Sequence, residues 1–194
     1  MILRALNVDL VPFAMNDVDE TYHRWLNDDN VVKYLEVAFS DRSLPALKTY
    51  IQNVLDNPNR YFYSIIVRDK KHRIGTASFE INQLHLTATW GYLIGEVGEW
   101  GSGAALEAQV AIFDHAFDSL GVRRFFGCAY SDNIASRFNL KRLGFTMEGT
   151  QRQHFLRDGM PIDMSCYGLL ADEWRTKRES YDRFRMSIGS NANT

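Results

Sequence analysis

Residues 87–120 read TATWGYLIGEVGEWGSGAALEAQVAIFDHAFDSL, and this stretch decides the fold. Its first part, up to Ile94, is rich in β-branched and aromatic residues and predicts a strand. Four glycines follow in residues 95–103, and an apolar stripe with helical spacing begins near Ala104. A strand, a glycine-rich turn and a helix can hold an anion, because unpaired N–H groups and the positive end of the helix dipole meet at the first helical turn.

The glycine spacing fits neither the G-x-G-x-x-G fingerprint of dinucleotide-binding proteins nor a P-loop. A second interpretation is therefore open at this point, in which the turn is only a flexible connection between the strand and the helix.

The composition indicates one globular domain without a nucleic-acid or membrane partner. The chain has 194 residues, 45% of them hydrophobic and 24% charged, with a net charge of −2. No broad basic field is present, and no apolar run is long enough to span a membrane. We therefore expect a cytoplasmic protein. Metal binding is not expected, because no His or Cys residues stand at ligand spacing.

The two cysteines, Cys128 and Cys166, lie in apolar, strand-like runs and lack C-x-x-C spacing. We expect reduced core residues here rather than a disulfide.

The rest of the chain alternates between strand-like and helical patterns. Strands are expected over residues 2–13, 61–68, 74–82, 87–94, 124–130, 146–156 and 160–170, with helices beginning near residues 17, 43, 104 and 134. The last residues, 171–194, start with a helical pattern and end in a polar sequence. Tyr181, Phe184 and Met186 leave two interpretations open, a homodimer contact or a loosely packed end.

Two motifs in this order, WGSGAALEA at residues 100–108 and NIASRFNLKRLGF at residues 133–145, resemble the GNAT acyl-CoA N-acetyltransferases. The branch resembled is that of the ribosomal-protein-alanine acetyltransferases. The resemblance implies a GNAT domain over residues 1–174 and a C-terminal tail over 175–194. It implies an α/β (α+β) fold with a mixed, mostly antiparallel seven-stranded sheet, split at the cofactor cleft, and helices on both faces.

The resemblance also implies acetyl-CoA as the co-substrate. Its pantetheine arm would follow the end of the strand at residues 93–94, and its diphosphate would take the amides of the turn. The cofactor-binding residues implied in this way are Leu93, Ile94, Glu99, Trp100, Gly101, Ser102, Gly103, Ala104, Asn133, Ser136 and Asn139.

The turn departs from the family's pattern. Ser102 stands where a lysine or arginine is common, and Gly98 takes the first position of the motif. Two acids, Glu96 and Glu99, lie in or beside the turn. A carboxylate near a diphosphate weakens binding unless it points away, so affinity is expected to rest on backbone amides and the helix dipole.

Acetyl transfer needs a neutral amine, a polarised thioester carbonyl and a proton for the leaving thiolate. Glu80 is a candidate base, although strand alternation also allows it to point to solvent. His154 is the second candidate base, oriented by Asp163 across a hairpin, or else a surface histidine. Because the second motif has Asn139 and no tyrosine, Tyr130 at a strand end is a candidate acid, with a core aromatic as the alternative.

The sequence thus predicts transfer of an acetyl group from acetyl-CoA to a primary amine. The acceptor expected is a small molecule, such as an amino sugar or a nucleotide-linked amino sugar. The segment WLNDDNVVKYLEV, residues 25–37, resembles one that lines the acceptor side in this branch, although it also reads as two short amphipathic helices. Two alternatives remain, a protein N-terminal acetyltransferase and a non-catalytic module that binds acyl-CoA.

Overall fold

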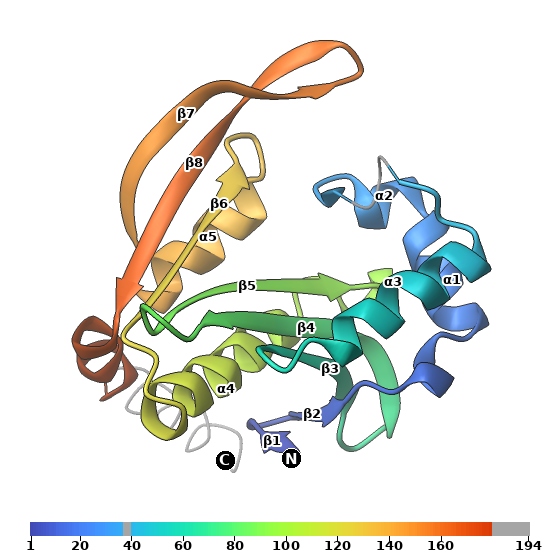
Figure 1. Ribbon diagram of the computed structural model, residues 1–194, viewed down its shortest axis with the longest axis horizontal. Helices are drawn as coiled ribbons and strands as arrows, with labels where there is room; N and C mark the ends of the chain where they lie inside the picture. Colours follow the sequence, from blue (N-terminus) through green and yellow to red (C-terminus); the bar gives the residue numbers. More distant parts are fainter. Residues whose placement is uncertain (37–39, 180–194) are drawn as a thin grey trace, which may run out of the picture. The chain divides into compact units, whose positions relative to one another are not determined.

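Five antiparallel strands form the sheet of residues 1–121, the first of two units in the chain. The structure is a computed structural model that describes residues 1–36 and 40–179. The strands follow one another in space as β1, β2, β3, β4 and β5 (Figure 1). They are β1 Leu3–Arg4, β2 Val8–Pro12, β3 Arg60–Val67, β4 His72–Asn82 and β5 Thr87–Ile94.

Helices cover both faces of this sheet. On one face, Phe62 of β3 packs against Phe13 within the core that also includes side chains of α1, α2 and α3. On the other face, Phe79 of β4 lies 6.4 Å from the ring of His115 in α4. The helical segments of this unit are η1 Met15–Asp17, α1 Glu20–Asn27, α2 Asp29–Val32, α3 Leu44–Asp56, η3 Val97–Glu99 and α4 Ala104–Ser119.

The predicted α/β class of the fold is confirmed, but the described residues form eight sheet strands rather than seven. The single first strand expected over residues 2–13 is in fact a pair, β1 and β2, that turns back on itself with Leu3 opposite Leu10. Asn7 lies in the turn between them, where its backbone N–H and its side-chain amide each donate to the Glu107 carboxylate of α4 at 2.7 Å. This turn therefore depends on a contact with α4, and the local sequence does not reveal that contact.

The second unit begins at Val122. Within it, β8 Met160–Leu170 lies between β6 Arg124–Tyr130 and β7 Thr146–Arg157, and both pairs are antiparallel. The helix α5, Ile134–Leu143, begins at the predicted residue. Asn133 caps its start and Gly144, at φ +91°, ends it.

The predicted helical start of the C-terminal segment is also confirmed. Residues 171–179 are helical, and Trp174 among them is 1% exposed. This helix runs through the expected boundary between residues 174 and 175. Tyr181, Phe184 and Met186 lie outside the described residues. No helix in the described part of the chain is long and apolar enough to cross a membrane.

The expectation of reduced core cysteines was wrong. Cys128 and Cys166 form a disulfide, and Cys128 is exposed rather than buried. The two residues stand directly opposite each other in the pairing of β6 with β8, so their side chains leave the same face of the sheet. Which residues oppose each other depends on strand register, which the spacing of the cysteines does not show.

This disulfide closes a loop of 38 residues, so its loss should destabilise the chain. We expect the double variant Cys128→Ser/Cys166→Ser to lose about 2–4 kcal/mol of unfolding free energy. Urea denaturation checks this value. Adding a reductant should destabilise the parent chain and leave the double variant unchanged, and equal stability of the two chains would contradict the disulfide.

Candidate cofactor loop and active site

The loop of residues 95–103, between β5 and α4, has the backbone shape of an anion site. Gly101 has φ +79° and Gly103 has φ +91°, values that residues with a side chain reach only with strain. A Cβ built at either glycine would meet no atom within 4 Å, so a ligand can approach the main chain there. Gly95 serves packing instead, because a Cβ on it would lie 2.1 Å from the Trp25 ring.

Several backbone N–H groups at the start of α4 are available to a ligand. Those of Gly101, Gly103 and Ala105 have no hydrogen-bond partner in the part of the chain that the structure describes. The Ala104 N–H donates to the Ser102 hydroxyl at 3.3 Å, beyond the usual N–H···O distance. Together with the positive end of the α4 dipole, these donors suit a diphosphate.

The two acidic side chains of the loop are held by cations. Glu96 Oε1 accepts from Arg24 Nη2 at 2.6 Å and from the Trp25 indole N–H at 2.9 Å. Glu99 Oε1 accepts from Lys70 Nζ at 2.7 Å. Arg24 and Trp25 belong to α1, and Lys70 belongs to the turn between β3 and β4. Sequence reasoning missed these three residues, because they are far from the loop along the chain.

Lys70 should influence cofactor affinity through Glu99, whose side chain is only 17% exposed. In Lys70→Met the Glu99 carboxylate loses its partner, and we expect the affinity for CoA to fall about fivefold to tenfold from charge repulsion. Titration calorimetry measures this. The double variant Lys70→Met/Glu99→Gln removes the repelling charge and should recover most of the affinity. A double variant as weak as the single one would mean that Lys70 acts by another route.

Trp100 and the end of β5 are connected by a hydrogen bond. The Trp100 indole N–H donates to the Ile94 carbonyl at 2.9 Å, while the side chain stays 49% exposed. Leu93 next to Ile94 is 7% exposed and belongs to the core formed with α1–α3. The hydrogen bond from Trp100 and the burial of Leu93 thus fix the end of β5, which is the part expected to meet the pantetheine arm.

The predicted residues of the second motif lie on α5, in the second unit. The Asn133 side chain accepts from the Ser136 backbone N–H at 3.1 Å, so Asn133 caps the start of the helix. Asn139 lies one turn after Ser136, and both are half-buried. Whether Asn133, Ser136 and Asn139 also contact the cofactor stays a prediction.

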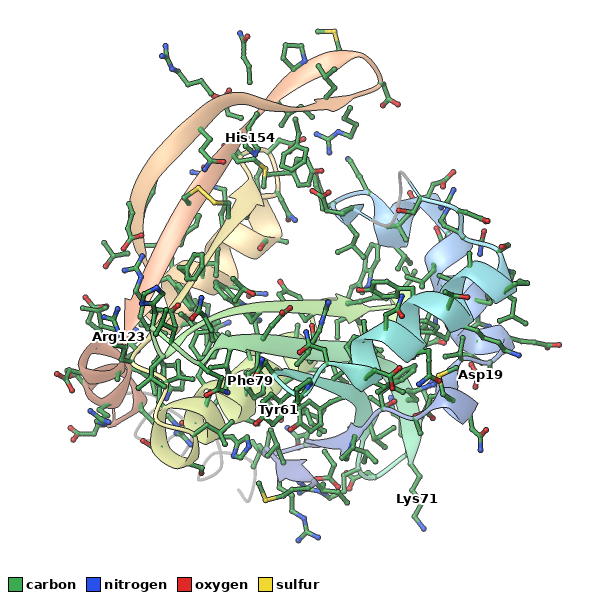
Figure 2. All side chains as sticks on the ribbon, in the orientation of Figure 1. Asp19, Tyr61, Lys71, Phe79, Arg123 and His154 are labelled. Atoms are coloured by element: carbon green, nitrogen blue, oxygen red, sulfur yellow. A yellow bond between two sulfur atoms is a disulfide. The ribbon has the colours of Figure 1, made fainter. Side chains whose placement is uncertain are left out.

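The expected pairing of His154 with Asp163 does not form. The Asp163 carboxylate instead accepts from the Gln153 backbone N–H at 2.8 Å. The reason is a shift in register between Gln151 and Phe155 of β7, which places residues 152–154 in a bulge opposite Asp163. His154 is exposed on this bulge (Figure 2), and its ring packs against Phe155 at 4.8 Å between centroids.

Glu80 lies in the first unit, on the sheet face opposite to that of Phe79. Its side chain is 45% exposed, so it is neither buried nor fully solvated. Oε1 accepts from the Asn57 side-chain amide at 3.1 Å, and Arg60 lies 3.9 Å from Oε2. On β5 its neighbour is Thr89, five residues before Ile94 and so about 17 Å along the strand from the loop.

Tyr130 is 4% exposed at the end of β6. Its ring packs against Phe155 at 5.4 Å between centroids, and the Arg157 guanidinium lies 5.5 Å from the ring centre. Arg157 in turn forms an ion pair with Asp132. Tyr130 is therefore a core aromatic, and a part for it in proton transfer stays a prediction.

The glycine turn, with its unpaired amides at the start of α4, has the geometry of a site for a phosphorylated group. The family model described as "Acetyltransferase (GNAT) domain" matches residues 7–146. The chain belongs to this family of N-acetyltransferases.

The similar proteins agree with this assignment. The N-acetyltransferase p20 of Bacillus licheniformis is 32% identical over 167 residues, covering 82% of this chain and 90% of that protein. The N-acetyltransferase YoaA of Bacillus subtilis is 35% identical over 105 residues, but the match spans only 58% of that relative and 53% of this chain. The fold is shared with the ribosomal L7/L12 alpha-N-protein acetyltransferase RimL, solved in complex with coenzyme A. That structure has a TM-score of 0.79 and 20% identity, over 89% of this chain and 99% of that chain.

Proposed function

We propose that the chain transfers the acetyl group of acetyl-CoA to a primary amine of a small molecule. An amino sugar or a nucleotide-linked amino sugar is the acceptor class we favour. The observation that carries the proposal is the set of unpaired amides at Gly101, Gly103 and Ala105, beside acids already held by cations. Such a site binds an anion through the main chain, as a diphosphate requires.

We assign the diphosphate of the co-substrate to residues 99–104 and its pantetheine arm to Leu93 and Ile94. Asn133, Ser136 and Asn139 stay predicted cofactor contacts on the strength of the second motif. Family membership and the RimL complex with coenzyme A support this assignment. When bound, acetyl-CoA supplies an acyl thioester whose carbonyl carbon an amine can attack.

The residues of the chain would supply proton transfer and charge stabilisation. Glu80 is the proposed base that takes a proton from the ammonium group of the acceptor, so that the neutral amine can attack the thioester, with His154 as the alternative. Glu80 is preferred because Asn57 already fixes its carboxylate, while the His154 ring has no carboxylate to orient it. Tyr130 is the proposed acid for the leaving thiolate, and backbone N–H groups near Leu93 would polarise the carbonyl.

Two other functions remain to be separated from this one. Likeness to RimL favours a protein N-terminus as the acceptor, although that likeness concerns the fold. The unusual residues Gly98 and Ser102 favour a module that binds acyl-CoA without turnover.

One assay distinguishes these functions. The chain is mixed with acetyl-CoA and a thiol reagent, and CoA release is recorded with glucosamine, with a nucleotide-linked amino sugar and with peptides that start in alanine or serine. We expect release that depends on an amino sugar. Release with peptides alone would indicate N-terminal acetylation. A rise in melting temperature with CoA, but no release with any amine, would indicate a binding module.

The proposal includes a cytoplasmic location, where a reducing environment would open the Cys128–Cys166 bond, and it includes a homodimer. Fractionation of cells that express the full chain checks the first, and sedimentation checks the second.

A further inference from the structure

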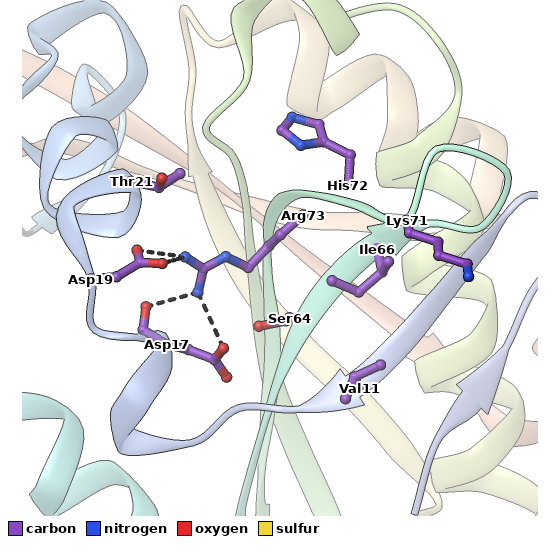
Figure 3. A pocket seen from close by; sticks show the side chains of 9 residues that line it. All are labelled: Val11, Asp17, Asp19, Thr21, Ser64, Ile66, Lys71, His72 and Arg73. Atoms are coloured by element: carbon purple, nitrogen blue, oxygen red, sulfur yellow. Dashed lines mark hydrogen bonds and ion pairs between the residues drawn. The ribbon is translucent and has the colours of Figure 1, made fainter.

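Arg73, near the start of β4, is a mostly buried charge in the first unit, and its side chain is 12% exposed. Its guanidinium reaches the segment that leads into α1 (Figure 3). Nη2 donates to both carboxylate oxygens of Asp19, at 2.5 and 2.6 Å, and Nη1 donates to the Asp17 backbone carbonyl at 2.7 Å. Three bonds from one planar group hold the guanidinium in a single orientation.

The ion pair of Arg73 with Asp19 ties the first turn of α1 to β4. Asp19 is the N-cap of this helix, and its Oδ1 also accepts from the Tyr22 backbone N–H at 2.9 Å. Partial burial opposes ionisation of Asp19, but hydrogen bonds from the Tyr22 N–H and from Arg73 outweigh it and lower the pKa of this carboxyl. Asp19 is therefore ionised at neutral pH, and the ion pair is present there.

Arg73 also contacts a side chain further along α1, that of Trp25. The Cζ atom of Arg73 lies 5.4 Å from the centre of the Trp25 ring, and Trp25 is 1% exposed. A guanidinium over an indole face is attracted by the ring, and more strongly where water is excluded. Arg73 therefore holds both the start of α1 and the indole ring that follows one to two turns later.

Trp25 in turn contacts the first two residues of the loop before α4. Its indole N–H donates to Glu96 Oε1 at 2.9 Å, and its ring packs so closely on Gly95 that a Cβ there would lie 2.1 Å from it. The backbone N–H groups of the same two residues donate to the Ile74 carbonyl, at 2.8 and 3.1 Å. Since Ile74 follows Arg73, one short piece of β4 fixes the start of the loop directly and also through Trp25.

We propose that Arg73 is a positioning residue for the binding of the coenzyme. Through Trp25 it holds Gly95 and Glu96 in place before the coenzyme arrives, so that the unpaired amides further along the loop keep the spacing that a diphosphate needs. A loop ordered in advance loses less conformational entropy on binding, which raises affinity. Arg73 itself is not among the proposed coenzyme contacts. The inference rests on one part of the proposed function, the assignment of the coenzyme to this loop.

The first test follows amide hydrogen exchange in the ligand-free whole chain by NMR. The Gly95 and Glu96 amides report on the start of the loop, because both are hydrogen-bonded there. In Arg73→Met these amides should exchange at least about tenfold faster, since the start of the loop opens more often. Unchanged exchange of both amides in the folded variant overturns the proposal.

Arg124→Met is the matched control for this test. Arg124 also donates through two nitrogens to one carboxylate, that of Glu148, at 2.7 and 2.5 Å, but both residues belong to the second unit. This variant should leave the exchange of the two loop amides unchanged. Equal acceleration in the Arg73 and Arg124 variants would indicate a general loss of stability, and the proposal would be wrong.

The second test measures the affinity for CoA by titration calorimetry. Arg73→Met should bind CoA about tenfold more weakly than the parent chain, and Arg124→Met should stay within about twofold. Trp25→Phe keeps an aromatic ring but removes the N–H bond to Glu96. In that background Arg73→Met should weaken binding by no more than about threefold, because Arg73 acts through Trp25. A full tenfold loss in both backgrounds would contradict this route.

A second variant keeps both tests decisive if Arg73→Met does not fold. Arg73→Met/Asp19→Asn removes the carboxylate charge that would lose its partner, and the asparagine can still cap α1. The same faster exchange and weaker CoA binding are expected of it, relative to Asp19→Asn, and their absence overturns the proposal.

These results can be told apart from a failure of the proposed function. Amide exchange needs no coenzyme, and CoA binding needs no turnover. A parent chain that binds CoA but transfers no acetyl group would overturn the proposed function alone. A parent chain without affinity for CoA would overturn both proposals.

Discussion

Gly103→Val should weaken CoA binding at least about 100-fold, because it covers the amides that replace charged side chains in this site. Gly103 has φ +91° at the cap of α4, so a side chain there strains the backbone by about 1–2 kcal/mol and stands over the anion site. Titration calorimetry with CoA gives the loss of affinity. Circular dichroism and the melting temperature show whether the variant remains folded.

Gly98→Ala is the matched control. Gly98 lies in the same loop, its φ is outside the left-handed region, and a Cβ on it would meet no atom within 4 Å. We expect its CoA affinity to stay within about twofold of the parent chain. If a folded Gly103→Val variant binds CoA as tightly as the control does, the diphosphate does not bind at this loop.

Glu80→Gln should lower kcat about 10²-fold to 10⁴-fold while the affinity for CoA stays the same, because only the proton acceptor is removed. The glutamine amide oxygen can still accept from Asn57, so the local structure should persist. Steady-state rates with the accepted amine measure the effect.

His154→Ala is the comparison for this prediction. His154 is exposed on the β7 bulge, and we expect its variant to keep a rate within about threefold of the parent chain. A normal rate for Glu80→Gln together with a large loss for His154→Ala would transfer the role of base to the histidine.

The sequence predicted the parts of the fold that depend on local pattern. The glycine turn and the apolar stripe placed the start of α4 at Ala104, and the helical pattern placed the start of α5 at Ile134, both as observed. The hairpin of β7 and β8 followed from alternation around a short turn.

The parts that failed depend on contacts between distant residues. Asn7, in the turn between β1 and β2, contacts Glu107, 100 residues further on. The Cys128–Cys166 disulfide and the bulge that displaces His154 both follow from strand register, which no local pattern fixes. Likewise, the cations that pair with Glu96 and Glu99 lie far from the loop along the chain, so only the structure reveals these contacts.

The contact of α1 with Glu96 joins two parts of the protein that selection would otherwise shape independently. Arg24 precedes and Trp25 begins the segment expected to line the acceptor, yet both hold Glu96 in the loop proposed to receive the coenzyme. Substitutions in α1 that allow a new amine to be accepted should therefore also change the affinity for the acyl donor. Altered acceptor range and altered coenzyme affinity should be inherited together in laboratory-evolved descendants of this chain.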